Sequence, residues 1–188
     1  ATASVAENQT SAIDVDATDA NTITYSISGT DAASFSINST SGIVTFNTAP
    51  NYESPTDDGA NNTYTVEVTA TDAAGNTDTQ TITITITDVT ETVTLTIGAI
   101  ADTTVAENAV FTGSTPAITG TPIGTLTYTL GGTDAADFTI NSTTGVISMV
   151  ARNFESPADA NTDNAYEVTI IATDSDGNTA SETQTVTV

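Results

Sequence analysis

The sequence contains no cysteine, histidine, lysine or tryptophan, and its one basic residue is Arg152. Without cysteine no disulfide can stabilise the fold, so stability has to come from a packed core, from bound metal ions, or from both. The lack of histidine and cysteine disfavours zinc and other metals that prefer nitrogen or sulfur ligands. It also closes most schemes with a nucleophile or general base, so we expect no enzyme.

Positive charge is almost absent as well. With 24 Asp and Glu residues against one arginine, the 188-residue chain has a net charge of −23. A surface of this kind repels nucleic acid and anionic lipid, and it attracts cations. No apolar run has the length of a transmembrane helix, which excludes direct membrane insertion. The strand pattern is still running at Val188, so we expect a piece of a longer chain.

The apolar residues that are present alternate with threonine. The clearest example is Thr81–Thr87, where Ile and Thr take every second position; Thr22–Ile27 and Tyr64–Ala70 show the same period. This alternation predicts strands with one face in a core and one in water. Short polar segments containing glycine, at Ser39–Gly42 and Ser142–Gly145, predict hairpin turns between strands.

Asp31 and Asp134 are each followed by two alanines and, four residues after the aspartate, by a phenylalanine. This spacing predicts a short helical turn with the aspartate as its N-cap, followed by a buried Phe35 or Phe138. About seven strands per hundred residues, joined by long connections, predict an all-β fold of two tandem Greek-key, seven-stranded β-sandwiches.

Three motifs occur twice, about 100 residues apart, which indicates tandem domains. They are Val-Ala-Glu-Asn at 5–8 and 105–108, Asn-Tyr/Phe-Glu-Ser-Pro at 51–55 and 153–157, and Ala-Thr-Asp at 70–72 and 172–174. We predict a first domain at residues 1–90 and a second at residues 91–188. The boundary has neither glycine nor proline, so composition does not mark a loose linker.

The repeated motifs place acidic residues at domain ends. In the first domain Glu7, Glu53, Asp88 and Glu91 are expected at one end, and Asp72 at the other. Converging carboxylates repel each other unless a cation neutralises them, and an all-oxygen set favours Ca²⁺ over Mg²⁺. A solvating acidic surface is the alternative interpretation. The recurring pairs are Glu7 with Glu107, Glu53 with Glu155 and Asp72 with Asp174.

This ordered set of motifs resembles cadherin-type repeats, and more narrowly the cadherin-like extender repeats of large bacterial surface adhesins. The resemblance implies Ca²⁺ bound at the joints between neighbouring repeats, an extracellular location on a cell surface, and a role in adhesion and biofilms. Glu7, Glu53, Asp88 and Glu91 match ligands on the first side of such a joint. Asp174 matches the aspartate that reaches back from the second repeat.

The resemblance assigns a further group to a joint with a preceding repeat. Asp19 and Asn21 match its early Asp-x-Asp motif, with Asp72 as their partner. The second repeat departs from the pattern, because Gly120–Gly124 stands where Asp-x-Asp is expected. Counting carboxylates, we expect fewer ions at this joint than in animal cadherins, two rather than three. The segment Thr92–Ala101 is expected to be a long approach to the second repeat.

Two further interpretations stay open. The segment Asp159–Asn164 alternates oxygen-bearing side chains like a calcium loop, although it lacks the later glutamate and the central glycine. The threonine row Thr81–Thr87 offers an exposed strand face for a sugar, a protein or ice. We favour a calcium-binding structural extender over such a ligand-binding module, and contacts between identical chains are not excluded.

Overall fold

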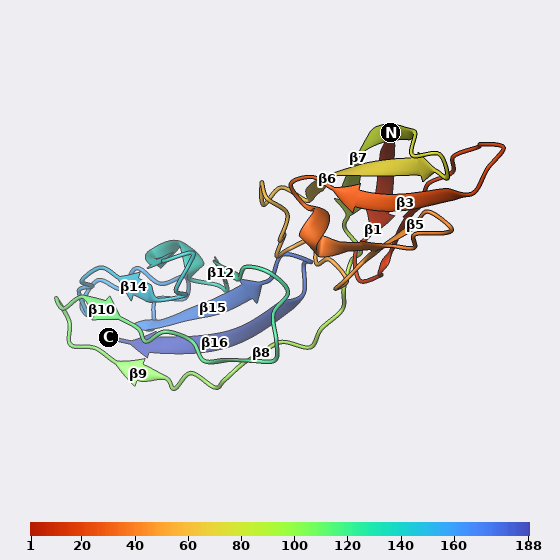
Figure 1. Cartoon of the computed structure of the whole chain (residues 1–188). Helices are drawn as coiled ribbons and strands as arrows, with labels where there is room; N and C mark the ends of the chain where they lie inside the picture. Colours follow the sequence, from red (N-terminus) through yellow and green to blue (C-terminus); the bar gives the residue numbers. More distant parts are fainter. The chain divides into compact units, whose positions relative to one another are not determined.

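The computed structural model describes all residues from Ala1 to Val188, and they divide into two compact units, Ala1–Thr90 and Glu91–Val188. Each is described by itself. Apart from one short 3₁₀ turn in each unit, all their secondary-structure elements are strands (Figure 1), which confirms the all-β prediction. The structure contains no helix of the length and hydrophobicity needed to cross a membrane. That the second unit is a second repeat of one family stays a prediction.

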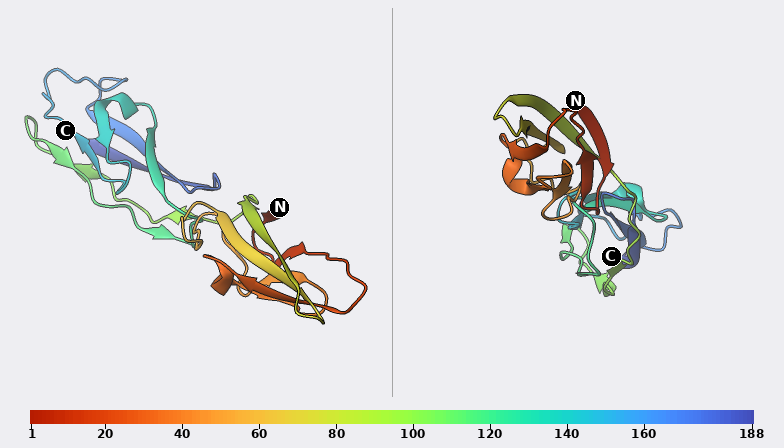
Figure 2. Two further views of the ribbon diagram at one scale, coloured as in Figure 1. Left: turned by 45° about the horizontal axis from the view of Figure 1, so that its top comes forward. Right: turned by 45° about the vertical axis from the view of Figure 1, so that its right-hand side comes forward.

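The first unit is a sandwich of seven strands in two sheets. One sheet has the order β1-β7-β6-β3 and the other the order β2-β5-β4. The longest strands, β6 and β7, lie side by side in antiparallel pairing (Figures 1 and 2). The elements are β1 (Thr2–Ala6), β2 (Ser11–Asp14), β3 (Ile23–Ser28), the 3₁₀ turn η1 (Ala32–Ser34), β4 (Phe35–Ile37), β5 (Ile43–Phe46), β6 (Thr63–Asp72) and β7 (Thr77–Thr87).

The predicted alternation is seen directly in β7. Ile82, Ile84 and Ile86 are at most 1% exposed and lie in the core, whereas Thr81 and Thr85 face solvent. The turns after β4 and β13 are also as predicted, and Gly42 and Gly145 supply the positive φ that each turn requires.

The second unit has the same seven strands and two more. Its main sheets have the orders β12-β15-β16-β9 and β10-β14-β13, and the additional pair is β11-β8. The elements are β8 (Thr96–Ile97), β9 (Thr103–Thr104), β10 (Phe111–Thr112), β11 (Ile118–Thr119), β12 (Thr127–Gly131), the 3₁₀ turn η2 (Ala135–Asp137), β13 (Phe138–Ile140), β14 (Ile147–Met149), β15 (Ala165–Thr173) and β16 (Thr179–Thr187).

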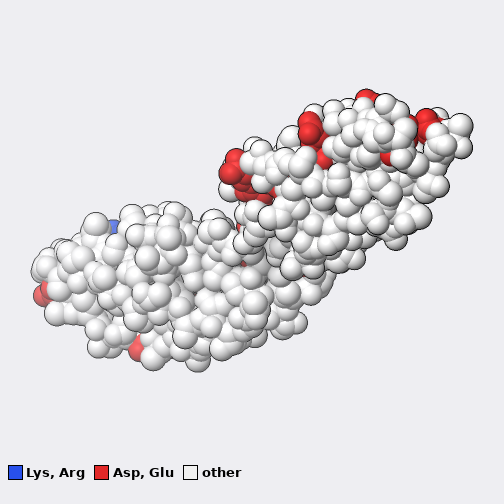
Figure 3. All heavy atoms as spheres, in the orientation of Figure 1, with Lys and Arg blue, Asp and Glu red and all other residues white.

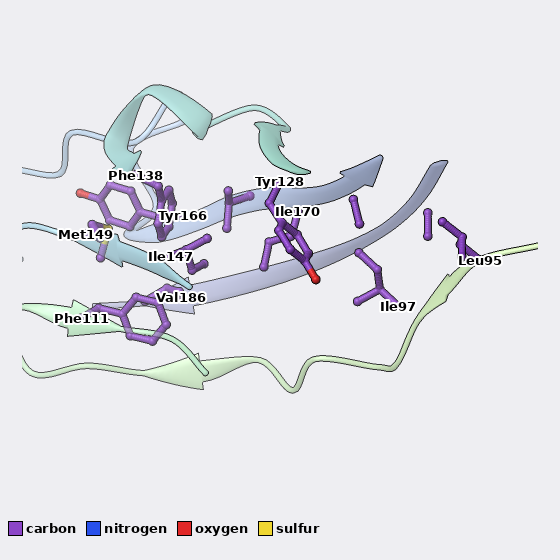
Figure 4. Close-up of a cluster of buried hydrophobic side chains, with 13 residues drawn as sticks. Leu95, Ile97, Phe111, Tyr128, Phe138, Ile147, Met149, Tyr166, Ile170 and Val186 are labelled. Carbon is purple, nitrogen blue, oxygen red and sulfur yellow. The ribbon is translucent and has the colours of Figure 1, made fainter. Parts of the chain in front are cut away.

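The additional pair corrects the expectation that Thr92–Ala101 is only an approach to the second repeat. Leu95 and Ile97 are 6% and 8% exposed and extend the core of the second unit past Tyr128 and Ile170 (Figure 4). The segment is held in place because burial of these two aliphatic side chains stabilises the unit, by about 1.5–3 kcal/mol for each fully buried one.

The predicted N-caps are correct in place but wrong in contact. Asp31 precedes η1, yet its carboxylate makes no capping hydrogen bond to that turn. It accepts the N–H groups of Asp58 at 2.8 Å and Thr65 at 2.7 Å. The backbone of Asp31 lies at φ −97° and ψ 8°, outside the extended conformation from which an N-cap side chain reaches back over its turn.

Asp134 repeats this arrangement in the second unit, accepting the N–H groups of Ala160 and Glu167, both at 2.8 Å. Phe35 and Phe138 are buried as predicted. Each aspartate therefore fastens a long connection to a central strand, which is a tertiary role that the local spacing does not reveal.

We expect Asp31→Ala to destabilise the first unit by about 2–4 kcal/mol, because it leaves two partly buried N–H groups without an acceptor. The neighbouring exposed Asp58 is the matched control, and Asp58→Ala should change the free energy of unfolding by less than about 0.5 kcal/mol. Urea unfolding of both variants measures the difference. Equal, small effects would contradict the tertiary role of Asp31.

Candidate metal centre

Three carboxylates meet at one end of the first unit. Glu7 follows β1, Glu53 lies in the connection between β5 and β6, and Asp88 follows β7. One oxygen from each lies within 4.8 Å of the others. Glu7 is only 3% exposed, Glu53 is partly buried and Asp88 is exposed, so the group opens to solvent on the side of Asp88.

Glu7 is held by backbone groups from two distant segments. One carboxylate oxygen accepts the N–H of Tyr52 at 2.8 Å, and the other accepts the N–H of Val89 at 2.9 Å. The backbone N–H of Glu7 in turn donates to Thr87 at 3.1 Å. The side chain is therefore fixed in place, next to the residues that leave the last strand.

The first unit has no cationic side chain to balance this group. Residues 1–90 contain no Lys, Arg or His, and the terminal ammonium group donates to Thr81, at the other end of β1 from Glu7. Arg152, the one blue patch in Figure 3, belongs to the second unit, where it pairs with Asp137 at 2.6 Å and lies over the ring of Tyr166. A hard cation with oxygen ligands is the partner that such a group fits.

The equivalent residues of the second unit form no such group. Glu107 and Glu155 are exposed, and Glu107 accepts only a long hydrogen bond, 3.4 Å, from the N–H of Phe154. In the first unit Val89, two residues past β7, holds the second oxygen of Glu7.

The other predicted ligands of the first unit lie at its opposite end. Asp19 and Asp72 line one hollow of about 440 Å³, together with Asp16 and Asp78, which sequence reasoning did not single out. Asn21 donates to Asp19 through its backbone at 2.8 Å and its side chain at 3.1 Å. Whether these residues hold an ion stays a prediction.

Asp72 also organises its own turn. Its carboxylate accepts N–H groups of Ala74 and Asn76 and the side-chain amide of Asn76, all between 2.7 and 2.8 Å. The side-chain and backbone hydrogen bonds from Asn76 hold the pKa of Asp72 below its usual value, with smaller contributions from the neighbouring N–H groups.

Asp174, the counterpart of Asp72, is 5% exposed and has more donors. Its carboxylate accepts the N–H groups of Ile123 at 3.0 Å, Asp176 at 3.1 Å and Asn178 at 2.9 Å, and the side-chain amide of Asn178. Burial alone would raise the pKa of Asp174, but these hydrogen bonds, led by that of Ile123, lower it below its usual value.

Glu91 belongs to the second unit. Its backbone N–H donates to the carboxylate of Asp176, and its carbonyl accepts the side-chain amide of Asn178 at 3.0 Å. Sequence reasoning missed Asp176 and Asn178. The available signal was the turn Asp-Ser-Asp-Gly-Asn at 174–178, which is more polar than Asp-Ala-Ala-Gly-Asn at 72–76.

The loop Asp159–Asn164 is organised by internal hydrogen bonds. The carboxylate of Asp159 accepts the N–H groups of Asp163 at 2.8 Å and Asn164 at 3.1 Å. Asp57 does the same in the first unit with Asn61 and Asn62. The alternating polar residues thus shape a loop in both units.

Because hydrogen bonds lower the pKa of Asp174 in the folded state, its carboxylate stabilises the second unit above the unfolded value of 3.8. That stabilisation is lost as the pH falls through the lower, folded value. At neutral pH we expect Asp174→Asn to cost about 1–3 kcal/mol, from the lost charged acceptor. In unfolding experiments with chelator, the difference in the free energy of unfolding between wild type and Asp174→Asn should become smaller below pH 3.8. A difference independent of pH would contradict this assignment.

Comparisons with known proteins agree with this fold. A cadherin domain profile matches residues 2–87. No curated protein gives a significant match. Among solved structures, Drosophila N-cadherin EC1-4 is 21% identical with a TM-score of 0.52, covering 99% of this chain and 47% of that one. Human CDH23 EC21-23 is 18% identical with a TM-score of 0.54, covering 100% and 71%.

Protocadherin gamma B2 extracellular cadherin domains 3-6 give a TM-score of 0.55 at 17% identity, covering 100% of this chain and 45% of that one. The chain thus spans about half the length of several solved relatives, among them N-cadherin EC1-4 at 47%. Residues 2–87 match the cadherin domain family, and the chain has the fold of cadherin repeats.

Proposed function

We propose that the first unit binds Ca²⁺ through Glu7, Glu53 and Asp88, and that the chain is a calcium-binding structural segment of an extracellular adhesion protein. The observation that carries the proposal is the meeting of these three carboxylates within 4.8 Å, in a unit without any Lys, Arg or His. The cadherin-like fold supports it, because cadherin domains generally bind Ca²⁺.

The ligand chemistry favours Ca²⁺ over other ions. All three side chains offer hard oxygen atoms, and Glu7 and Glu53 come from different connections, which permits a flexible and irregular coordination shell. Mg²⁺ requires near-ideal octahedral geometry and keeps most of its water. Backbone carbonyls and water would complete the shell, since three carboxylates supply fewer than the six to eight oxygens that Ca²⁺ takes.

A bound ion would order the segment that leaves the first unit. Asp88 and Val89 lie directly after β7, and Val89 already donates to Glu7. A cation shared by Glu7 and Asp88 adds a second tie to the same segment. It thereby restricts the backbone between one repeat and the next, which is what a stalk made of consecutive repeats requires.

The surroundings of such a stalk follow from its chemistry. Extracellular modules typically bind Ca²⁺ with a Kd of about 10⁻⁴ to 10⁻³ M, so sites of this kind are filled outside cells and empty inside them. A chain with a net charge of −23 would fold and stiffen on reaching calcium-containing medium. We infer a position in a cell-surface adhesin, with neighbouring repeats as partners.

No observation favours the alternative of a sugar-binding or ice-binding face to the same degree. The aromatic side chains that a sugar site would use are largely buried, including Tyr25, Tyr64, Tyr128 and Tyr166. The outer positions of β7 carry hydroxyl groups that pair with similar residues on β6, as in Thr83 with Thr65. This describes a solvated sheet face.

The proposal predicts a calcium-dependent melting temperature. With Ca²⁺ at a hundredfold excess over Kd, one site adds about 2.7 kcal/mol, which raises the melting temperature of the first unit by about 10 °C or more relative to chelator. Mg²⁺ at the same concentration should give a much smaller rise. Thermal melts followed by circular dichroism, with calorimetric titration of Ca²⁺, measure both.

Glu7→Gln and Glu53→Gln should each remove most of this calcium-dependent rise. The matched controls are Glu107→Gln and Glu155→Gln, at the equivalent positions of the second unit, where the carboxylates are not grouped. These controls should keep the wild-type response. If Ca²⁺, Mg²⁺ and chelator give the same melting temperature, the acidic group is a solvated surface and the proposal fails.

A further inference from the structure

The beginning of the second unit is held by side chains of the turn between β15 and β16. Asp176 accepts the N–H of Glu91 through its carboxylate. The side chain of Asn178 donates to the carbonyl of Glu91 at 3.0 Å and accepts the N–H of Val93 at 3.2 Å. Asn178 thus bonds the backbone of this leading segment, Glu91–Val93, much as a neighbouring strand would.

The turn that makes these contacts is itself fixed. Asp174 accepts the N–H groups of Asp176 and Asn178, and its own N–H donates to the carbonyl of Asn178 at 3.0 Å. The Asn178 side-chain amide also donates to Asp174 at 3.0 Å. The amide is thereby shared between Asp174 and Glu91, so its orientation is determined by both.

A loop of the same unit covers Asp174 from the other side. Ile123 donates its N–H to Asp174 at 3.0 Å, and its carbonyl accepts the N–H of Ser175 at 3.0 Å. Thr125 donates its N–H to the hydroxyl of Ser175 at 2.9 Å. This loop stands where the sequence of the first unit has Asp19 and Asn21.

The two units differ at the residues that make these contacts. The first unit has Ala73 and Ala74 where the second has Ser175 and Asp176. Asp72 is only partly buried, and the hydrogen bonds to its carboxylate come from its own turn. In the second unit this turn therefore makes additional hydrogen bonds, which hold the loop at Ile123 and the leading segment.

The carboxylate of Asp174 is also poorly disposed toward a cation. It is 5% exposed and accepts four N–H groups, from the backbones of Ile123, Asp176 and Asn178 and from the Asn178 side chain. A cation would have to displace these donors, and it would meet their positive ends first. Glu7 is also buried, but it accepts one backbone N–H at each oxygen and lies beside two further carboxylates. The negative charge of Asp174 is already compensated by hydrogen bonds within the second unit.

We propose that Asp176 and Asn178 form a cation-independent anchor for Glu91–Val93, and that Asp174 supports this anchor instead of binding Ca²⁺. Asp176 and Asn178 are then positioning residues that fix the start of the second unit by hydrogen bonds alone. The statement that Asp174 does not bind Ca²⁺ rests on the proposed function, because it concerns which residues supply the ligands of the proposed ion. The anchor itself does not.

Amide hydrogen exchange of the wild-type chain tests the anchor directly. The N–H groups of Glu91 and Val93 should be protected equally in Ca²⁺ and in chelator, because their acceptors are side chains of the second unit. Asn178→Asp keeps an acceptor for Val93 but removes the donor to Glu91, and Asp176→Ala removes the acceptor of Glu91. Asp176→Ala should release Glu91, and leave the exchange of the strand β15 unchanged.

Calcium titration of Asp174→Asn tests the statement that Asp174 does not bind Ca²⁺. The Kd for Ca²⁺ should stay within about twofold of wild type, whereas Glu7→Gln should raise it by about tenfold or more, equivalent to about 1.4 kcal/mol. Asn76→Asp in the first unit is the matched control for Asn178→Asp, and it should leave the protection of Glu91 and Val93 unchanged. If Glu7→Gln has no effect, the proposed function fails while the anchor stands.

Two results would overturn the inference. The first is protection of Glu91 and Val93 that disappears in chelator, since an anchor made of hydrogen bonds does not need the ion. The second is a Ca²⁺ affinity or stoichiometry that falls in Asp174→Asn as much as in Glu7→Gln. If Asp174→Asn does not fold, hydrogen exchange of the wild-type chain still decides whether the anchor depends on calcium.

Discussion

Buried carboxylates that accept backbone N–H groups tie the long connections of both units to their sheets. Asp31 and Asp134 join a connection to a central strand, and Asp57 and Asp159 close the loop that precedes it. Glu7 ties the connection between β5 and β6 to the segment that follows β7. In a chain with one basic residue, these N–H groups are the main internal source of positive charge, so an acid can be buried without a salt bridge.

The acidic residues of the two units fall into two kinds, according to how their negative charge is compensated. Asp174 is enclosed by donors and its charge is compensated, so it belongs to the framework of the second unit. Glu7, Glu53 and Asp88 bring three carboxylate oxygens within 4.8 Å of one another, and Glu7 accepts one backbone N–H at each of its oxygens. The convergence of several carboxylates therefore distinguishes a candidate cation site from a single carboxylate enclosed by donors, although both contain acidic residues of repeated motifs.

The two units also show how a repeated motif can take different roles. The turns at 72–76 and 174–178 share their aspartate, glycine and asparagine, and in both the aspartate closes the turn. Ser175 and Asp176 replace two alanines of the first unit, and these two changes add the contacts to Thr125 and Glu91. The second unit also has the additional strand pair β8 and β11, and Leu95 and Ile97 of this region pack in its core.

Hydrophobic alternation and turn residues, both local in the sequence, predicted the strands, the hairpin turns and the sandwich architecture. The end of the unit at which Glu7, Glu53 and Asp88 lie was also predictable, since strand order fixes where connections emerge. The tertiary structure alone decided which backbone groups each carboxylate contacts. Asp31 looks like an N-cap until the partners contributed by distant segments are seen, and Asp174 likewise accepts an N–H from the distant Ile123. Such partners lie more than 20 residues away, so their positions depend on how the whole unit packs.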